Sequence, residues 1–243
     1  MRLHYLQHIE LEHPGSILEW ARSREFEITR TRFFAGDSLP GPEDFDWLVI
    51  MGGPMNIYEE EEYPWLISEK KLIRSAIENG KTVLGLCLGA QLISDVIGGK
   101  VTKEPQPEIG WHTVRWNERA QLHPFFSFFP QESTVFQWHY DTFSILPDEA
   151  VVLADSPVCS HQAFLYGERV IGLQFHLENT LELVEGYIRE SGHEMQPAAY
   201  VQTPEQVLGG APEHLKRNNA WMAELLARLE ASDPNAQERK VII

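Results

Sequence analysis

The sequence predicts an α/β fold in which helices flank a doubly wound, mostly parallel sheet, with a helical extension at the C-terminal end. Short apolar runs alternate with segments of helical period, which is the pattern of parallel strands joined by crossover helices. One run, Asp46–Met51, is apolar on both faces, as expected for a strand covered by helices on both sides. The length of 243 residues fits one large domain, placed at residues 1–190, with residues 191–243 as an extension packed on it.

The first half of the chain supplies the predicted parallel strands in order. Four strands are expected, at residues 3–6, 26–34, 46–51 and 82–86. Three helices are expected between and after them, at residues 16–24, 64–79 and 89–97. Pro14-Gly15 precedes the first helix, Asn79-Gly80 ends the second and Gly98-Gly99 ends the third, as is common at helix boundaries.

The second half changes character from Val101 onward. Its apolar runs are short and are interrupted by six prolines before residue 174, which favours short antiparallel strands and loops on the same core. One more buried strand is expected at Val170–His176, followed by a helix from about Thr180 to Glu190. The extension should begin as a loop and then form a helix from about Pro212 to Leu229.

Composition excludes several classes of function. The chain has 20 Lys and Arg against 36 Asp and Glu, and its net charge of −16 repels phosphate backbones and anionic membranes. We therefore expect no nucleic-acid partner and no membrane association. The two cysteines, Cys87 and Cys159, offer no disulfide framework, and residues 1–10 do not resemble a secretion leader, so a cytoplasmic location is expected.

The clearest sign of chemistry is the motif Gly85-Leu86-Cys87-Leu88-Gly89, between a predicted strand and a predicted helix. It is the thiol form of a nucleophile elbow, in which flanking glycines permit a tight, strained turn. The positive end of the following helix would stabilise the thiolate of Cys87, which is the reactive form of cysteine. A buried structural cysteine at a tight turn is the alternative interpretation of the same motif.

A thiol nucleophile needs a base, and His176 stands at the end of the last strong strand, two residues before Glu178. Alternate residues of a strand share a face, so Glu178 is expected beside the imidazole, which it would orient. Another central strand ends at Gly52-Gly53. The backbone N–H of Gly53, with that of Leu88 after the nucleophile, is expected to form an oxyanion hole.

Together, in this order and spacing, the segments GGPM, GLCLGAQL and GLQFHLE resemble the class I glutamine amidotransferase family, of the triad type found in GMP synthetase and anthranilate synthase. The resemblance covers roughly residues 40 to 185. It extends to Glu108–Trp111, Gln137–Asp141 and Gln162–Phe164, which are similar to motifs of a stand-alone branch related to the GMP synthetase glutaminase. It implies a flavodoxin-like fold of three layers, which agrees with the order of elements above.

The resemblance implies a cysteine-nucleophile glutaminase. Cys87 would attack the side-chain amide of glutamine, His176 would act as general base and acid, and Glu178 would orient it. The resulting γ-glutamyl thioester would be hydrolysed by water, with ammonia and glutamate as products. The resemblance implies no metal and no organic cofactor, and no cysteine and histidine spacing typical of a zinc site occurs in the sequence.

The resemblance also implies substrate contacts. Gln91 matches the position that holds the amino-acid end of glutamine, and the pocket would be lined by Trp138, Tyr140 and Asp141. Two positions depart from the family pattern, Ala90 where many members have His and Leu177 where many have Pro. Neither departure removes a catalytic group, so they concern substrate preference more than activity.

Three functions remain open from the sequence. The first is a hydrolase of glutamine or another γ-glutamyl compound, the second is a stand-alone γ-glutamyl peptidase acting on small peptides, and the third is a non-catalytic regulatory subunit. The stretch after residue 185 is too short for an ATP-using synthetase domain, and the chain has no G-x-x-x-x-G-K-[ST] phosphate loop. Any acceptor of ammonia is therefore expected on a separate synthetase or acceptor subunit.

Overall fold

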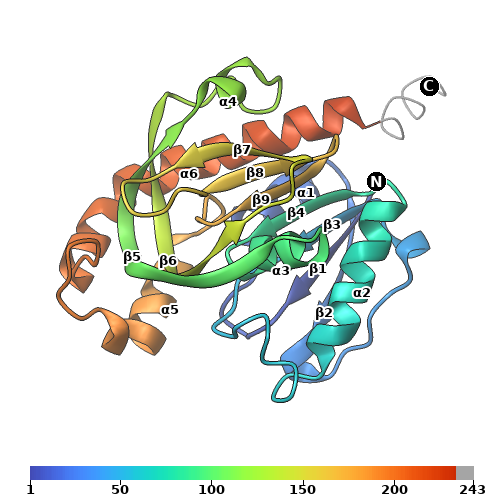
Figure 1. The fold of residues 1–243 in the computed structure, drawn as a ribbon, viewed down its shortest axis with the longest axis horizontal. Helices are drawn as coiled ribbons and strands as arrows, with labels where there is room; N and C mark the ends of the chain where they lie inside the picture. Colours follow the sequence, from blue (N-terminus) through green and yellow to red (C-terminus); the bar gives the residue numbers. More distant parts are fainter. Residues whose placement is uncertain (234–243) are drawn as a thin grey trace.

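The structure is a computed structural model, and it describes residues 1–233. Within that range nine strands form one sheet, in the order β2-β1-β3-β4-β9-β8-β7-β5-β6 (Figure 1). Each of the first five strands in this order is parallel to its neighbours among the five. They are β1 (Arg2–Gln7), β2 (Glu27–Arg32), β3 (Trp47–Ile50), β4 (Thr82–Leu86) and β9 (Val170–Leu173). The predicted α/β fold around a mostly parallel sheet is confirmed.

The other four strands run antiparallel to their neighbours. They are β5 (Lys100–Trp116), β6 (Glu132–Ile145), β7 (Ala150–Asp155) and β8 (Ala163–Tyr166). The expectation of short strands throughout this half is wrong for β5 and β6, which have 17 and 14 residues. Pro105 and Pro107 interrupt the sequence of β5, but the β5–β6 register shifts between Lys103 and Glu108. The prolines, which have no N–H to donate, therefore fall where the ladder is broken.

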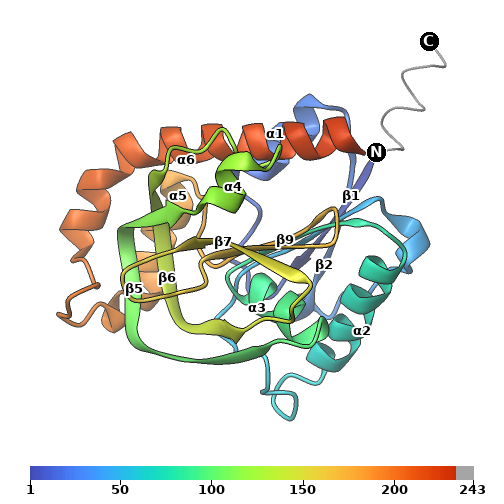
Figure 2. The same cartoon turned by 45° about the horizontal axis from the view of Figure 1, so that its top comes forward.

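Helices cover both faces of the sheet and give three layers. Figures 1 and 2 show α1 and α6 on one side, with α2 and α3 on the other. The α-helices are α1 (Ser16–Ser23), α2 (Trp65–Glu78), α3 (Leu88–Val96), α4 (Glu118–Leu122), α5 (Leu181–Ser191) and α6 (Pro204–Ser232). Three short 3-10 turns are η1 (Phe33–Ala35), η2 (Pro42–Asp44) and η3 (Gly192–Glu194). The strand expected to reach Phe34 therefore ends at Arg32, because the chain turns into η1.

The apolar side chains of strand β3 pack on both faces of the sheet, against the two helical layers. Trp47 and Val49 belong to the core between the sheet and the helices α1 and α6, whereas Leu48 and Ile50 belong to the core under α2 and α3. All four side chains are buried. Alternate residues of a strand point to opposite faces, so a strand with helices on both sides must be apolar at every position.

The C-terminal helix begins earlier than the sequence predicts. The sequence predicts a helix from about Pro212, but α6 starts at Pro204 and contains Pro212 in its interior. The Thr203 side chain accepts the N–H of Gln206, and the Gln206 side chain accepts the N–H of Thr203, which is a capping box with proline at the first helical position.

The face of α6 that packs on the sheet is long and apolar. Leu225, Leu226 and Leu229 lie in the same core cluster as the first strands. The last part of the predicted extension, residues 234–243, lies outside the described residues. Among residues 1–233, no helix is both long and apolar enough to cross a bilayer.

Candidate active site

The candidate site lies at the edge of the sheet where β1, β3, β4 and β9 end. These strands are neighbours and run parallel, so their carboxyl ends meet at one edge, where open α/β sheets bind ligands. Gly53 follows β3, Cys87 follows β4 and His176 follows β9. The sheet order thus brings together three motifs that are far apart in the sequence.

Cys87 occupies a strained turn between β4 and α3. It is the residue before the helix and has φ 50° and ψ −108°, a left-handed conformation that residues with a side chain rarely adopt. The flanking glycines are required by space. A Cβ at Gly85 would lie 2.5 Å from the backbone of Gly89, and a Cβ at Gly89 would collide with the carbonyl group of Ile50. The predicted elbow is therefore the observed local geometry.

His176 and Glu178 form a buried pair beside this turn. The Nδ1 atom of His176 lies 2.6 Å from Oε1 of Glu178, and both side chains are 1% exposed. The strand expected to reach His176 ends earlier, at Leu173. His176 leaves the regular strand because its N–H donates to the carbonyl of Phe136 in β6, at 2.8 Å. This bridge fixes the backbone of the histidine.

The charge around His176 favours the imidazolium. Burial by itself would lower its pKa, but the Glu178 carboxylate and the neighbouring Cys87 thiol raise the pKa well above its usual value. The Cys87 thiol is 7% exposed, with its Sγ atom 3.7 Å from the carbonyl oxygen of Trp138. The side-chain amide of Gln174 donates to the same sulfur at 3.6 Å. The thiol therefore lies next to the His176 ring, a backbone carbonyl and a side-chain amide.

A pocket of about 390 Å³ opens above the thiol. Six of the nine predicted site residues line it: Gly53, Cys87, Gln91, Trp138, Tyr140 and Asp141. His176 and Glu178 lie buried behind the thiol, and Leu88 is buried as the first residue of α3. In residues 1–233, no protein acceptor pairs with the backbone N–H of Gly53 or of Leu88. The two predicted oxyanion donors are thus unpaired.

The predicted substrate contacts are themselves held by hydrogen bonds. The Gln91 amide donates to the carbonyl of Asp141 at 2.9 Å and to the side-chain oxygen of Gln174 at 3.3 Å. The Trp138 indole N–H donates to Glu194 at 3.2 Å. Burial and the adjacent Glu194 raise the pKa of Tyr140 to about 12, so its hydroxyl stays protonated at neutral pH. These side chains form a preorganised pocket wall.

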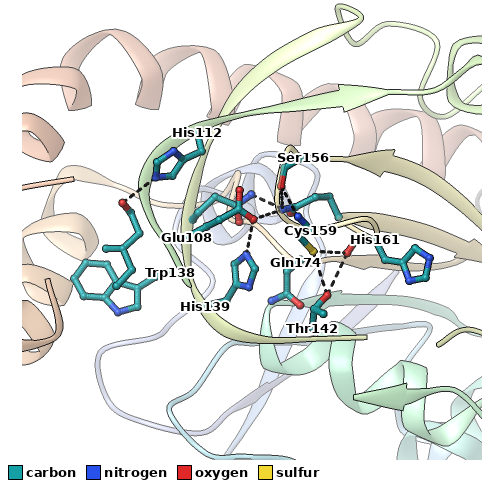
Figure 3. Close-up of polar contacts among 12 residues, drawn as sticks. Glu108, His112, Trp138, His139, Thr142, Ser156, Cys159, His161 and Gln174 are labelled. Atoms are coloured by element: carbon teal, nitrogen blue, oxygen red, sulfur yellow. Dashed lines mark hydrogen bonds and ion pairs between the residues drawn. The ribbon is translucent and has the colours of Figure 1, made fainter. Parts of the chain in front are cut away.

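A buried polar cluster supports this wall from behind (Figure 3). Gln162 donates to Glu108 at 2.6 Å, and His139 lies 3.2 Å from the same carboxylate oxygen. Gln137 donates to the side-chain oxygen of Gln162 at 2.9 Å. Figure 3 shows the ring of Trp138 pointing away from this cluster, as alternation along β6 requires. The three outlying motifs of the sequence therefore converge, and they hold the strand segment that carries the predicted substrate contacts.

Sequence reasoning missed several residues of the pocket. Glu12, which follows β1, lines it and is only 7% exposed. Burial raises the pKa of Glu12, while His176 and a hydrogen bond from Tyr187 oppose that rise. Glu190 and Glu194 also line the pocket, and no Lys or Arg among residues 1–233 does so. Open α/β sheets bind ligands at the carboxyl ends of their parallel strands, and this applies to the residues after β1 as much as to Cys87 after β4. The same reasoning could have identified Glu12.

Cys159 lies apart from the pocket as a structural thiol. It is buried in the antiparallel half, 3.2 Å from the Thr142 hydroxyl, as Figure 3 shows. Burial raises the pKa of Cys159 to about 12, so the unreactive thiol form is favoured. No group of three or more His, Cys, Asp or Glu side chains within residues 1–233 is arranged to hold a metal ion.

The fold and the site together define a three-layer α/β protein with a cysteine, histidine and carboxylate constellation at the end of a parallel sheet. The model of the family described as glutamine amidotransferase class-I matches residues 16–192. The chain belongs to this class I glutamine amidotransferase family.

Relatives and solved structures agree with that membership. The chain is 39% identical to the glutamine amidotransferase-like protein YfeJ of Salmonella typhimurium over 202 residues, which cover 82% of this chain and 84% of the relative. A GMP synthase (glutamine-hydrolyzing) of Macrococcus caseolyticus is 32% identical over 150 residues, which cover 59% of this chain but 27% of that enzyme. A glutamine amidotransferase structure from Thermotoga maritima has a TM-score of 0.85 and 31% identity, covering 94% of this chain and 97% of that one.

Proposed function

We propose that the chain hydrolyses the side-chain amide of glutamine, or the γ-amide of another γ-glutamyl compound, with Cys87 as the nucleophile. The observation that carries the proposal is the position of the Cys87 thiol in a positive-φ turn, beside an imidazole 2.6 Å from Glu178. Backbone strain of this kind persists where the surrounding structure enforces it, as at active sites. Membership of the family supports the same reaction.

In the first half of the reaction, the Cys87 thiolate attacks the amide carbon. A C–S bond forms, the π electron pair of the C=O bond moves to the oxygen, and the result is a tetrahedral intermediate that carries an oxyanion. Within residues 1–233 the N–H groups of Gly53 and Leu88 donate to no protein acceptor, so both can donate to this oxygen. His176, as imidazolium, gives its proton to the amide nitrogen, the C–N bond breaks, and ammonia or an amine leaves. A γ-glutamyl thioester remains on Cys87.

In the second half, neutral His176 takes a proton from water, and the hydroxide attacks the thioester. The C–S bond breaks, glutamate leaves, and the thiolate and imidazolium are restored. Glu178 keeps the ring in one orientation and stabilises its charged form in both halves. The raised pKa of His176 suits this exchange, because the ring is charged when the nitrogen must be protonated.

A γ-glutamyl compound larger than glutamine is a second candidate substrate. The pocket reaches from Cys87 past Trp138 to Glu190 and Glu194, near and beyond the end of α5, so it extends well beyond the thiol and can hold a substituent larger than an amide NH2 group. The intact triad favours catalysis over a purely regulatory subunit. If ammonia is transferred rather than released, we propose that the acceptor belongs to a separate synthetase or acceptor subunit.

The test is the release of glutamate from glutamine and from a panel of γ-glutamyl amides and dipeptides. Cys87→Ala should abolish release, whereas Cys159→Ala, the matched change at the other cysteine, should leave it unchanged. A glutamine-analogue electrophile should label Cys87 and spare Cys159. Equal turnover by wild type and Cys87→Ala would refute the proposed nucleophile, and absence of turnover with every substrate would refute hydrolysis by the chain alone.

A further inference from the structure

A second buried histidine and carboxylate pair lies beside the pocket, and the reaction above does not use it. His8, one residue beyond β1, has its Nε2 atom 2.9 Å from Oε1 of Glu69 in α2, and both side chains are fully buried. The ring of His8 also stacks on Phe33 and Trp65, at centroid distances of 5.4 and 5.5 Å. Its orientation is therefore fixed from several sides.

The other nitrogen of His8 reaches the backbone of the glycine pair. Nδ1 lies 2.8 Å from the carbonyl oxygen of Gly52. A carbonyl oxygen only accepts, so Nδ1 must carry a proton. Nε2 faces the Glu69 carboxyl group at the same time, and an ionised carboxylate also only accepts, so with Glu69 ionised both nitrogens carry protons and the ring is an imidazolium. Burial opposes this charge, but Glu69, the Gly52 carbonyl and Glu12 raise the pKa of His8 above its usual value.

The direction of the Gly52 carbonyl fixes the direction of the Gly53 N–H. The two groups belong to one planar peptide unit, and no peptide bond among the described residues is cis. In a trans peptide the C=O and the N–H point in opposite directions. The carbonyl points to the buried His8, so the N–H points away from it, and Gly53 lines the pocket while His8 does not.

We propose that His8 and Glu69 form a positioning pair that turns the Gly53 N–H toward the oxyanion and polarises it. A positive charge bound to the carbonyl oxygen withdraws electron density from the peptide, which makes the N–H a stronger donor. This inference rests on the proposed function, because the oxyanion arises in that reaction. It assigns roles to two residues that touch neither the substrate nor the thiol.

The protonation of His8 can be tested without turnover. NMR of protein with ¹⁵N-labelled histidine at neutral pH should show protons on both ring nitrogens of His8, assigned by their loss in His8→Asn. A proton on only one ring nitrogen would refute the charged state proposed for His8.

Kinetics test the role in catalysis. His8→Leu removes the donor to Gly52 and should lower kcat by about 10²-fold, the loss typical for one oxyanion donor, with KM within about threefold. His8→Asn, whose amide can replace Nδ1 as donor but carries no charge, should recover only the part of that loss that comes from positioning, which leaves a loss of about tenfold. Glu69→Gln keeps a partner for Nε2 but removes the carboxylate that favours the charged ring, and we expect a loss of up to about tenfold, no larger than that of His8→Asn. If Glu69→Gln has the same kcat as wild type, the proposal that the charge on His8 polarises the Gly53 N–H is refuted.

Alkylation separates positioning from general damage. Iodoacetamide reacts with the Cys87 thiolate without forming an oxyanion, so its rate in His8→Leu should stay within about threefold of wild type. Unchanged kcat in His8→Leu, or a parallel fall of kcat and alkylation, would overturn the proposal. His4→Leu changes a buried histidine that lies within β1 and away from the pocket; it is the matched control and should leave both rates unchanged.

One further variant and the activity of the wild type keep the outcomes distinct. His8→Leu leaves Glu69 buried without its counter-charge, so the double variant His8→Leu with Glu69→Leu removes the pair together and should show the same loss of kcat. An inactive wild type would refute the proposed function, with the NMR result still deciding the state of His8. An active wild type with unaffected variants would refute only the positioning pair.

Discussion

Replacing Glu178 with glutamine tests the charge on His176 while the nucleophile stays intact. Glu178 binds Nδ1 of His176 at 2.6 Å in a site where both side chains are 1% exposed. Glutamine has a similar shape and can still accept that hydrogen, but it carries no charge. The pKa of His176 is raised by Glu178, so the variant should lower it toward the value that burial favours.

The size of the effect follows from the contact. A hydrogen bond to a charged group contributes about 1.5–3 kcal/mol, and one pKa unit corresponds to 1.36 kcal/mol, so the pKa of His176 should fall by about one to two units. In the proposed reaction the imidazolium protonates the leaving nitrogen, so we expect activity to be lost as pH rises through this pKa. The alkaline limb of the kcat profile should therefore move to lower pH by a similar amount, and kcat should fall by about 10²–10⁴-fold.

The assay is glutamate release across a pH series, with the active substrate at saturation. Glu182→Gln, an exposed carboxylate at the start of α5, is the matched control and should leave the profile unchanged. A lower kcat with an alkaline limb at the wild-type pH would refute the electrostatic role of Glu178, since loss of orientation alone does not move that limb.

Two further predictions concern stability, measured by urea unfolding. Gly89→Ala should destabilise the fold by about 1–3 kcal/mol because its Cβ would collide with Ile50. Gly209→Ala, in an open position of α6, should stabilise the fold by about 0.5–1 kcal/mol. Equal stability of the two variants would contradict this prediction. Burial lowers the pKa of His4 to about 4, so the unfolded chain binds the proton more readily and stability should fall as pH drops from about 6.5 to 4. His4→Gln should remove roughly 1–3 kcal/mol of that dependence, and an unchanged dependence would contradict the assignment.

Much of the fold could be predicted because its signals are local. The run Asp46–Met51 shows by composition alone that it is covered on both sides, and the structure confirms it as β3. The elbow around Cys87 is also a local property, since two glycines and a strand-to-helix junction lie within five residues. His176 and Glu178 are two residues apart, so their contact depends little on the remainder of the chain.

Other features of the fold and the site depend on contacts between segments that are far apart in the sequence, and the local sequence does not predict those contacts. The length of β5 depends on a register shift against β6 that accommodates its prolines. The direction of the Gly53 N–H depends on His8 and, through it, on Glu69 in a different helix. Sheet order brings these groups together, and sheet order is set by the packing of the whole core. The sequence by itself therefore determined the fold class, the tight turn at Cys87 and the pairing of His176 with Glu178. Only the tertiary structure decided which backbone donors and buried charges surround them, because those contacts join segments that are distant along the chain.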